Sequence, residues 1–434
     1  MSEKKTNYVS RRSFIGTSVI GLAGLTFLPG FKSLVSANNT INLGFIGLGR
    51  QAMSLLDGFL KIDGVRVIAG CDVYGIKRIR FQKRVINYYL NSGNKANVKM
   101  YENYDDLLSN PDIDAVVIAT PDHWHAIIAI KACKAGKDVY LEKPMTFTIL
   151  EGQKLVEAVR DNKRILHVGS QQRSDPNFQR AVKFVQEGKI GAIRKINAHV
   201  GGPPTPYNLP EEEIPHDLNW DKWLGPNPYV HFNSQLNPPI TLDPLKNETL
   251  WGAWRWYKEV GGGFTTDWGA HMFDVAQWAL GMDKSGPIEI IPAGYMDTKF
   301  LTFKYENGVI MTEEKFNAEM KGVKFWGSDG WIEVARGFFN ASDEKLNPVK
   351  NSAGVVEYET SVSHYQKFID SILSRKDTNA TVETGHRSCT VCNLGNLAYE
   401  LNRPVKWDPS KENFVKDKKA KEYLHREYRK GYSI

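Results

Sequence analysis

Cysteine is scarce in this sequence, with four residues among 434. Cys71 lies in an apolar run typical of a strand, and Cys133 lies in a helical pattern, so both are expected in the core. Cys389 and Cys392 form a single C-x-x-C pair, and the second ligand pair that such metal sites need is absent from the sequence. We therefore expect a structural role for all four cysteines and no metal site.

An excess of charge of one sign is missing from the body of the chain. The net charge is +7, but residues 1–37 carry five Lys or Arg against one Glu, and residues 411–434 carry eight against four acids. Residues 38–410 are therefore close to neutral, without the basic footprint of a nucleic-acid-binding protein. We expect the basic C-terminal tail, residues 411–434, to be a solvated helix or arm. Contact with a membrane surface or a partner subunit stays open.

Long apolar runs are also lacking. The run at residues 15–28 is shorter than the roughly 20 residues that span a bilayer. It follows Ser10-Arg11-Arg12-Ser13-Phe14 and precedes a small-residue site at 35–37, an order that resembles a twin-arginine signal peptide. We therefore expect residues 1–37 to direct export of the folded protein to the periplasm, with no integral membrane segment in the mature chain.

Strand and helix patterns alternate from Ile41 onward, which predicts βαβ units and a parallel sheet. The expected strands are 41–48, 65–71, 115–120, 139–141 and 165–168, and the expected helices are 52–59, a stretch from 76, 125–135 and 150–162. The run AVVIAT at 115–120 is apolar throughout, as in a strand buried on both faces.

The pattern changes after about residue 170. Short strand patterns flank Asn307-Gly308 and Ser328-Asp329-Gly330, and both are strong hairpin signals. Helices are expected at 364–373 and 384–401. The fold class is therefore α/β, with a second α+β domain over residues 169–410 built on a largely antiparallel sheet.

The sequence GFIGLGRQA at residues 44–52 contains G-x-G-x-x-A between a strand and a helix. In this motif Gly47 makes the tight turn, Gly49 lets backbone amides approach a pyrophosphate, and Ala52 allows close helix–strand packing. The helix N-terminus then faces the phosphates. We predict a Rossmann NAD(P)-binding domain over residues 41–168.

Asp72 stands at the end of the second strand, where an acid can hold the ribose hydroxyls of the cofactor. A carboxylate there disfavours a 2′-phosphate, which predicts NAD as the cofactor. The nearby cations Lys77, Arg78 and Arg80 keep NADP open.

The stretch GGGFTTDWGAHMFDVAQWAL, residues 261–280, predicts one helix after a glycine loop, capped by Thr265 or Thr266. Asp267 and His271 lie four residues apart and would share one helix face. A carboxylate beside an imidazole suits proton transfer at a substrate hydroxyl. The alternative is an ordinary first-turn Asp and a structural core His.

Further motifs complete a set that resembles the glucose–fructose oxidoreductase/inositol dehydrogenase/MocA family, written Gfo/Idh/MocA. They are T-P-D-H-W-H at 120–125, E-K-P at 142–144 and Q-Q-R at 171–173, and the resemblance covers nearly all of residues 41–408. It implies an NAD(P)-dependent oxidoreductase acting on CH–OH groups, with a small-molecule carbohydrate as substrate. It also implies a homodimer or homotetramer formed through an exposed face of the antiparallel sheet.

The resemblance implies a role for each matching position. Lys143 would reach the nicotinamide ribose and the reacting hydroxyl, Asp267 would bind the substrate or orient His271, and His271 would take the hydroxyl proton. The residues expected at the cofactor are Gly47, Leu48, Gly49, Arg50, Gln51, Asp72, Thr120, Pro121, His125, Glu142, Lys143 and Gln171. Those expected at the substrate are Arg173, Arg255, Tyr257 and Trp268, with one or two of the seven tryptophans between residues 220 and 278 stacking on a sugar.

Three classes of function stay open. The first is an exported sugar, glycoside or polyol oxidoreductase with a tightly bound nicotinamide, since the periplasm has no free pool of that cofactor. The second is a redox-neutral glycoside hydrolase or lyase that oxidises a sugar transiently, which the D-x-x-x-H motif disfavours because those enzymes carry a T-H-G pattern. The third is a non-catalytic sugar-binding protein, disfavoured by the presence of Lys143, Asp267 and His271 together.

Overall fold

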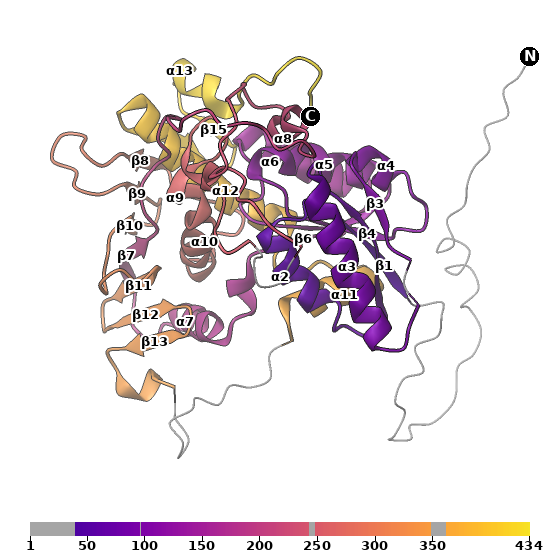
Figure 1. The fold of residues 1–434 in the computed structure, drawn as a ribbon. Coiled ribbons are helices and arrows are strands. Elements are labelled where there is room, and N and C mark those ends of the chain that lie inside the picture. The colour runs from indigo at the N-terminus through magenta and orange to yellow at the C-terminus, as the bar shows by residue number, and fades with distance from the viewer. Residues whose placement is uncertain (1–39, 96, 243–247, 349–361) are drawn as a thin grey trace, which may run out of the picture. The chain divides into compact units, whose positions relative to one another are not determined.

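The computed structural model describes residues 40–95, 97–242, 248–348 and 362–434 (Figure 1). The expected signal peptide, residues 1–37, lies outside these ranges. Within them, no helix is both long enough and apolar enough to cross a bilayer. All four cysteines are free and buried.

The expected Rossmann-type α/β fold of the first domain is confirmed by a six-stranded parallel sheet. Its spatial order is β3 (Lys99–Tyr101), β2 (Val65–Cys71), β1 (Ile41–Ile46), β4 (Ala115–Ile118), β5 (Asp138–Leu141) and β6 (Leu166–Val168). The helices are α2 (Arg50–Phe59), α3 (Gly75–Asn91), α4 (Tyr104–Leu108), α5 (Asp122–Lys134) and α6 (Ile149–Asp161). The strand order reverses between β1 and β4, where a crevice for ligands opens in such sheets.

The expected antiparallel sheet is also present, as a nine-stranded sheet with one parallel pair between β7 and β10. Its order is β13 (Phe338–Ala341), β12 (Trp331–Ala335), β11 (Gly322–Gly327), β7 (Ile193–His199), β10 (Ile310–Thr312), β9 (Thr302–Lys304), β8 (Glu289–Ile291), β14 (Val405–Asp408) and β15 (Asn413–Phe414). Both expected hairpins form, as β9–β10 and β11–β12.

Helices α7 (Pro176–Gln186), α10 (Gly269–Ala279) and α12 (Val382–Leu401) cover one face of this sheet (Figure 1). The fully buried rings of Phe273, Phe303 and Phe325 lie in the core between helices and sheet. Helix α12 also packs against α6 of the first domain, so it lies between the two domains. The remaining short helices are α8 (Trp220–Leu224), α13 (Lys418–Lys421), η2 (Gln171–Ser174), η4 (Ala253–Trp256), η5 (Glu344–Leu346) and η6 (Glu422–Leu424).

The stretch 261–280 forms two helices, so the expectation of a single helix capped by threonine is wrong. Helix α9 (Gly263–Asp267) ends before Trp268, and α10 begins at Gly269. Thr265 lies inside α9, whose N-cap is Gly262 without a side-chain cap. Gly263 has φ of +70°, and a Cβ there would lie 2.4 Å from the backbone nitrogen of Pro204. Glycine is therefore required where the chain enters α9.

Helix α11 (His364–Ser374) follows the second sheet in the chain but packs into the core of the first domain. Phe368, Ile369 and Ile372 join the cluster that contains Phe45 and Phe59. The core of the first domain therefore includes a helix that lies about 200 residues beyond the last strand of its sheet.

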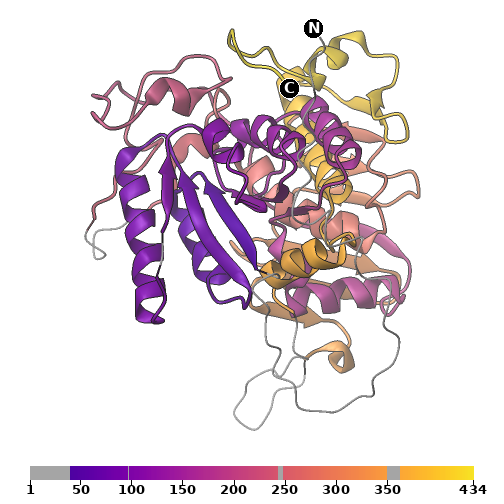
Figure 2. The ribbon, with the colours of Figure 1, turned by 90° about the vertical axis from the view of Figure 1, so that its right-hand side faces the viewer.

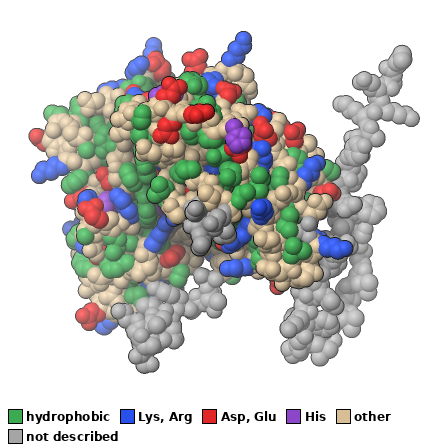
Figure 3. Space-filling model, in the orientation of Figure 1, with side chains coloured by type: hydrophobic (Ala, Val, Ile, Leu, Met, Phe, Trp, Pro, Cys, Tyr) green, Lys and Arg blue, Asp and Glu red, His purple; other side chains and the backbone are tan. Residues whose placement is uncertain are grey.

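The C-terminal segment 411–434 is folded onto the protein, so the expectation of a solvated arm is wrong. Strand β15 pairs with β14, and Phe414 and Ala420 are buried in the core of the second domain. Basic side chains of the segment bind protein oxygens instead of solvent alone: Arg429 donates to the carbonyl of Gly225 at 2.7 Å. On the face seen in Figure 3, basic and acidic side chains are interspersed.

Candidate active site

Two adjoining cavities open at the carboxyl ends of β1, β2 and β4. The glycine-loop cavity, about 240 Å³, is lined by the glycine loop and the residues after β2 and β4. The lysine cavity, about 600 Å³, contains Lys143, Asp267 and His271. The cavities share Gln51, Ala119, Thr120, Trp251, Trp254 and Arg255, so a ligand that fills the first can extend to the second.

The glycine loop is shaped for close approach of an anion. Gly47 has φ of +80°, and a Cβ there would lie 2.6 Å from the backbone nitrogen of Thr120, so only glycine fits. At Gly49 a Cβ would meet nothing nearer than Lys77 Nζ at 3.9 Å, which leaves the backbone open to the cavity. Helix α2 begins at Arg50 without a side-chain cap, so its first amides can bind phosphate oxygens.

Asp72 lies at the end of β2 with its carboxylate fixed by two backbone amides. Leu48 N donates to Oδ2 at 2.7 Å and Tyr74 N donates to Oδ1 at 2.9 Å. Each carboxylate oxygen can accept a further bond from a ligand hydroxyl in the glycine-loop cavity, which Asp72 lines. The Leu48 side chain is fully buried, so this residue contributes only its backbone.

Thr120 and Pro121 line the glycine-loop cavity, and the Thr120 hydroxyl is buried without a hydrogen-bond partner among the described residues. Such an orphaned group suits a bound ligand. His125 does not line either cavity: its ring lies between the carbonyls of Thr120, at 3.0 Å, and Pro144, at 2.7 Å. Burial lowers the pKa of His125 to about 4, so it is neutral and holds the two loops together.

Glu142 is buried at the base of the lysine cavity. Its Oε1 accepts hydrogen bonds from Gln51 and Gln171, both at 3.0 Å. Burial raises the pKa of Glu142, with Gln51, Lys143 and Gln171 opposing that effect. The two glutamine side chains therefore join the glycine loop and the segment after β6 to the E-K-P motif.

Lys143 and Asp267 form an ion pair in the lysine cavity. Lys143 Nζ donates to Asp267 Oδ1 at 2.8 Å and to the Asp267 carbonyl at 2.9 Å. Arg255 lies on the other side of the carboxylate, with Nε 3.5 Å from Oδ1. Burial alone would raise the pKa of Asp267, but the two cations outweigh it and hold the pKa below its ordinary value. Asp267 is therefore ionised and fixes the lysine side chain.

His271 lies in the first turn of α10, and its hydrogen bonds run to Arg336 and Gln172 rather than to Asp267. Arg336 Nη2 donates to His271 Nε2 at 3.0 Å. With the Gln172 amide assigned from its surroundings, its oxygen accepts from Arg336 at 3.0 Å, and its nitrogen and oxygen lie 2.7 Å and 3.3 Å from His271 Nδ1. Burial lowers the pKa of His271 well below its ordinary value, and Lys143 and Arg336 add to the effect. The imidazole is neutral and can accept a proton.

Comparison with known proteins identifies the family of this chain. Residues 41–170 match the family model described as "Oxidoreductase family, NAD-binding Rossmann fold", and residues 204–434 match "Oxidoreductase family, C-terminal alpha/beta domain", both of the Gfo/Idh/MocA type. The chain belongs to the Gfo/Idh/MocA oxidoreductase family. Its glycine loop, α2 N-terminus, Asp72 and Thr120 hydroxyl together fit an NAD molecule in the glycine-loop cavity.

Relatives of this Gfo/Idh/MocA protein include the inositol 2-dehydrogenase of Salmonella typhimurium (strain LT2), 28% identical over 47% of this chain and 62% of that protein. The glycosyl hydrolase family 109 protein 2 of Shewanella sp. (strain ANA-3) is 32% identical over 38% of this chain and 33% of that protein. The fold is similar to that of aldose-aldose oxidoreductase from Caulobacter crescentus, with a TM-score of 0.59 and 17% identity over 85% of this chain and 99% of that one.

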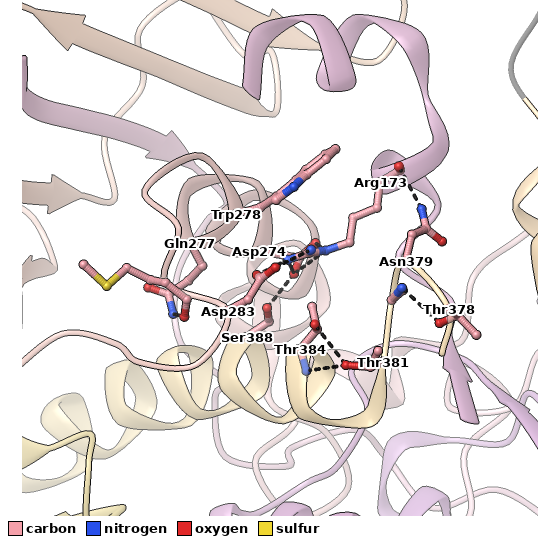
Figure 4. A network of polar contacts seen from close by, with 12 residues as sticks. Arg173, Asp274, Gln277, Trp278, Asp283, Thr378, Asn379, Thr381, Thr384 and Ser388 are labelled. Atoms are coloured by element: carbon pink, nitrogen blue, oxygen red, sulfur yellow. Dashed lines mark hydrogen bonds and ion pairs between the residues drawn. The ribbon is translucent and has the colours of Figure 1, made fainter. Parts of the chain in front are cut away.

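Two residues expected at the substrate lie elsewhere in this family member. Arg173 is buried outside the cavities and binds Asp274 and Asp283, with Nη2 2.8 Å and 2.7 Å from their carboxylates (Figure 4). Its guanidinium is therefore occupied by structural partners. Tyr257 packs edge-on against Tyr207 at 5.2 Å in a separate cluster and lines none of the cavities described.

The tryptophans divide between cavity and core. Those that line the lysine cavity are Trp251, Trp254, Trp256 and Trp268. The Arg255 guanidinium carbon lies 4.3 Å from the centre of the Trp254 ring, and that of Arg336 lies 4.9 Å from the centre of the Trp268 ring. Trp256 is stacked on Phe264 at 4.0 Å, so one face of its ring is already covered. Trp220 and Trp223 stack on each other in a buried cluster, and Trp223 also lines the glycine-loop cavity.

Three residues that line the lysine cavity were not predicted from the sequence as site residues: Gln172, Arg336 and Asp122. Gln172 lies in the Q-Q-R motif, but the motif does not say which glutamine faces the histidine. Arg336 lies 65 residues after His271, on the turn between β12 and β13, where no motif marks it. Burial raises the pKa of Asp122 to about 8, so this carboxyl is largely protonated at neutral pH. No group of three or more His, Cys, Asp or Glu in the described ranges is placed to hold a metal ion.

Proposed function

We propose that the protein is an NAD-dependent oxidoreductase that oxidises a CH–OH group of a sugar, glycoside or polyol. The observation that carries the proposal is the ion pair of Lys143 and Asp267 beside neutral His271, in a cavity that adjoins the glycine loop. The inositol 2-dehydrogenase among the relatives supports the same class of reaction.

The geometry suggests how the residues share the work. A carbinol carbon gives up its hydride only as the proton of its hydroxyl group leaves, so a base must reach the hydroxyl oxygen. His271 Nε2 accepts the proton once the substrate hydroxyl replaces the Arg336 guanidinium. Lys143, held by Asp267, donates to the developing alkoxide and stabilises it. NAD, when bound, supplies the acceptor for the hydride.

Substitution of the base tests the proposal. With a panel of polyols and sugars, His271→Ala should lower kcat/KM by about 10²- to 10⁴-fold, the usual contribution of a general base. Lys143→Met should cause a comparable loss. His216→Ala is the matched control, because His216 is exposed and lines neither cavity. Full activity of His271→Ala, with its fold intact by circular dichroism, would refute the assignment of the base.

We propose that the cofactor is NAD rather than NADP. The three cations that could have bound the 2′-phosphate of NADP bind protein groups instead. Lys77 donates to Asn237 at 2.7 Å, Arg78 to the Asp72 carbonyl at 2.6 Å, and Arg80 to the Leu48 carbonyl at 2.6 Å. The Asp72 carboxylate would also repel a 2′-phosphate.

Substitution of Asp72 tests this preference. Asp72→Ala should weaken NAD binding by about 10- to 100-fold, the cost of a hydrogen bond to a charged group, and leave NADP binding nearly unchanged. Equilibrium titration with both dinucleotides measures the ratio, with the exposed Asp57→Ala as control. Equal weakening of the two cofactors would remove the argument for NAD.

We further propose that the protein is exported to the periplasm with its cofactor already bound. The support is the twin-arginine sequence at residues 10–14, since that route carries folded proteins. Purified protein should then release a dinucleotide on denaturation and exchange it slowly with labelled NAD while native. Protein that is empty, or that exchanges freely, would contradict export with a retained cofactor.

A redox-neutral glycoside hydrolase or lyase is the second candidate function. The observation that favours it is the similarity to a glycosyl hydrolase family 109 protein, 32% identical over the aligned part. Cleavage of aryl glycosides by protein carrying only its own bound NAD, with no net NADH formed, would establish this function. Stoichiometric NADH formation without cleavage would establish the first.

A further inference from the structure

The last residues of the described chain lie against the first domain at the glycine-loop cavity. Figures 1 and 2 show this C-terminal segment in yellow above the purple helices of that domain. Tyr432 lines the cavity, and its ring meets the ring of Trp124 edge-on with centroids 5.6 Å apart. Trp124 in turn meets Tyr104 edge-on at 5.5 Å. Three aromatic rings from distant parts of the chain therefore lie together beside this cavity.

Contacts from both sides fix Trp124. Its Nε1 donates to the Trp223 carbonyl at 3.0 Å, and its ring packs on Gly225, where a Cβ would come within 2.3 Å of it. Trp124 therefore forms a rigid wall. Tyr432 is the part of the aromatic group that the C-terminal segment supplies.

Arginine side chains of the same segment hold Tyr432 in place. Arg429 donates to the Gly225 carbonyl at 2.7 Å and to Asp221 Oδ1 at 2.6 Å. Tyr432 N donates to the Arg429 carbonyl at 3.2 Å. Arg426 donates to Asn227, and its guanidinium lies 3.8 Å from the centre of the Phe147 ring. The position of Tyr432 is therefore tied to buried groups of the loop that contains Gly225.

The place of this aromatic group indicates its ligand. Asp72, which is expected to hold the adenosine ribose, lines the same cavity, and so do Tyr104, Trp124 and Tyr432. Lys143 and His271 lie instead in the adjoining cavity, where the reacting end of the cofactor must be. The aromatic group therefore lies at the adenine end of the cofactor. Flat rings bind a nucleobase by stacking.

We propose that Tyr432 of the C-terminal segment binds the adenine end of NAD and slows its release. Together with Trp124 and Tyr104, the segment forms the aromatic end of the cavity, so the bound cofactor leaves only after its contact with Tyr432 is lost. This role rests on NAD binding by the Rossmann domain and does not depend on the substrate of the enzyme.

Fragments of the cofactor test the proposal directly. Protein unfolded to release its dinucleotide and then refolded is titrated with ADP-ribose, with nicotinamide mononucleotide and with NAD. Tyr432→Ala should weaken ADP-ribose and NAD by about tenfold, the loss of one stacking contact, and leave nicotinamide mononucleotide unchanged. The dissociation rate of NAD, followed by displacement with labelled NAD, should rise by a similar factor. Tyr432→Phe keeps the ring and should retain the wild-type values.

The exposed Lys430→Ala, in the same segment, is the matched control. Unchanged ADP-ribose affinity and NAD dissociation in Tyr432→Ala would overturn the proposal. An equal loss of affinity for nicotinamide mononucleotide would also overturn it, because the effect would then be on the whole cavity. A wrong assignment of the reaction would leave these binding results as they are, so the two failures are distinguishable.

Discussion

At the scale of single residues, the proposed chemistry depends on a neutral imidazole held among cations. His271 is buried, and Lys143 and Arg336 both oppose its protonation. Arg336 also donates to Nε2, the nitrogen that we assign as the base. Among the described residues, Arg336 has no carboxylate within ion-pair distance, although the charges of Asp267, Glu142 and Asp175 act on it from farther away.

Replacement of Arg336 by methionine should change the pH dependence of the reaction. Because Arg336 lowers the pKa of His271, Arg336→Met should raise that pKa. The base is active when unprotonated, so the acidic limb of the kcat/KM profile should move to higher pH, while activity well above the new pKa should change less. The profile is measured beside Arg66→Met, an exposed substitution far along the chain from the cavity. An acidic limb that stays in place would show that Arg336 does not act through His271.

At the scale of elements, Arg173 joins η2 to α10 and α12 instead of meeting substrate. Its guanidinium is 3% exposed, and its partner Asp274, on α10, is 1% exposed. Ser388 on α12 donates to the same Asp274 carboxylate at 2.6 Å, and Asn379 donates to the Arg173 carbonyl at 3.0 Å (Figure 4). Loss of the arginine would leave a buried carboxylate without its main partner.

Arg173→Ala should therefore destabilise the protein by about 3–5 kcal/mol, as expected for one half of a buried ion pair, and leave the KM of the folded enzyme unchanged. Arg84→Ala is the control, because Arg84 and Asp57 form a pair that is 55% and 47% exposed and worth about 0–1 kcal/mol. Chemical denaturation measures the first quantity and steady-state kinetics the second. A raised KM of Arg173→Ala at unchanged stability would instead support a role of Arg173 in substrate binding.

At the scale of the whole molecule, helices cover one face of the nine-stranded sheet, and no helix of the described residues covers the other (Figure 1). On the second face Ile310, Lys195, Trp326 and Trp331 lie in one cross-strand row. Ile310 and Trp326 are 39% and 38% exposed, which is high for large apolar side chains in the middle of a sheet. The family resemblance implies that two subunits associate through such a face.

We expect the purified protein to be a homodimer or homotetramer by light scattering, joined through this face. Trp326→Glu should dissociate it, because a carboxylate would be buried without a partner in the interface. Tyr229→Glu, on a loop and 64% exposed in the wild type, should leave the assembly intact. A wild-type monomer across the micromolar range would contradict this expectation.

Much of the first domain could be predicted from sequence because its signals are local. The apolar run at β4 and the glycine loop each occupy a few consecutive residues. The observed bounds of strand β4 and of helix α2, which follows the loop, lie within a few positions of the expected ones. Strand β7 carries no such signal, because its partners β10 and β11 lie more than 100 residues away. The sequence pattern predicts a helix at 364–373, where α11 lies, but the place of this helix in the first domain depends on apolar packing that sequence order does not record.

Motifs in the sequence are enough to identify the residues that can do chemistry: a glycine loop before a helix, an acid after the second strand, and a lysine, an aspartate and a histidine. The partners of these residues follow from the folded chain alone. It paired Asp267 with Lys143 rather than with His271, placed Arg336 on the imidazole, withdrew Arg173 into the core and brought Tyr432 to the cofactor cavity. Motifs record short stretches of backbone, whereas charge pairing and burial depend on side chains that meet only after the chain has folded.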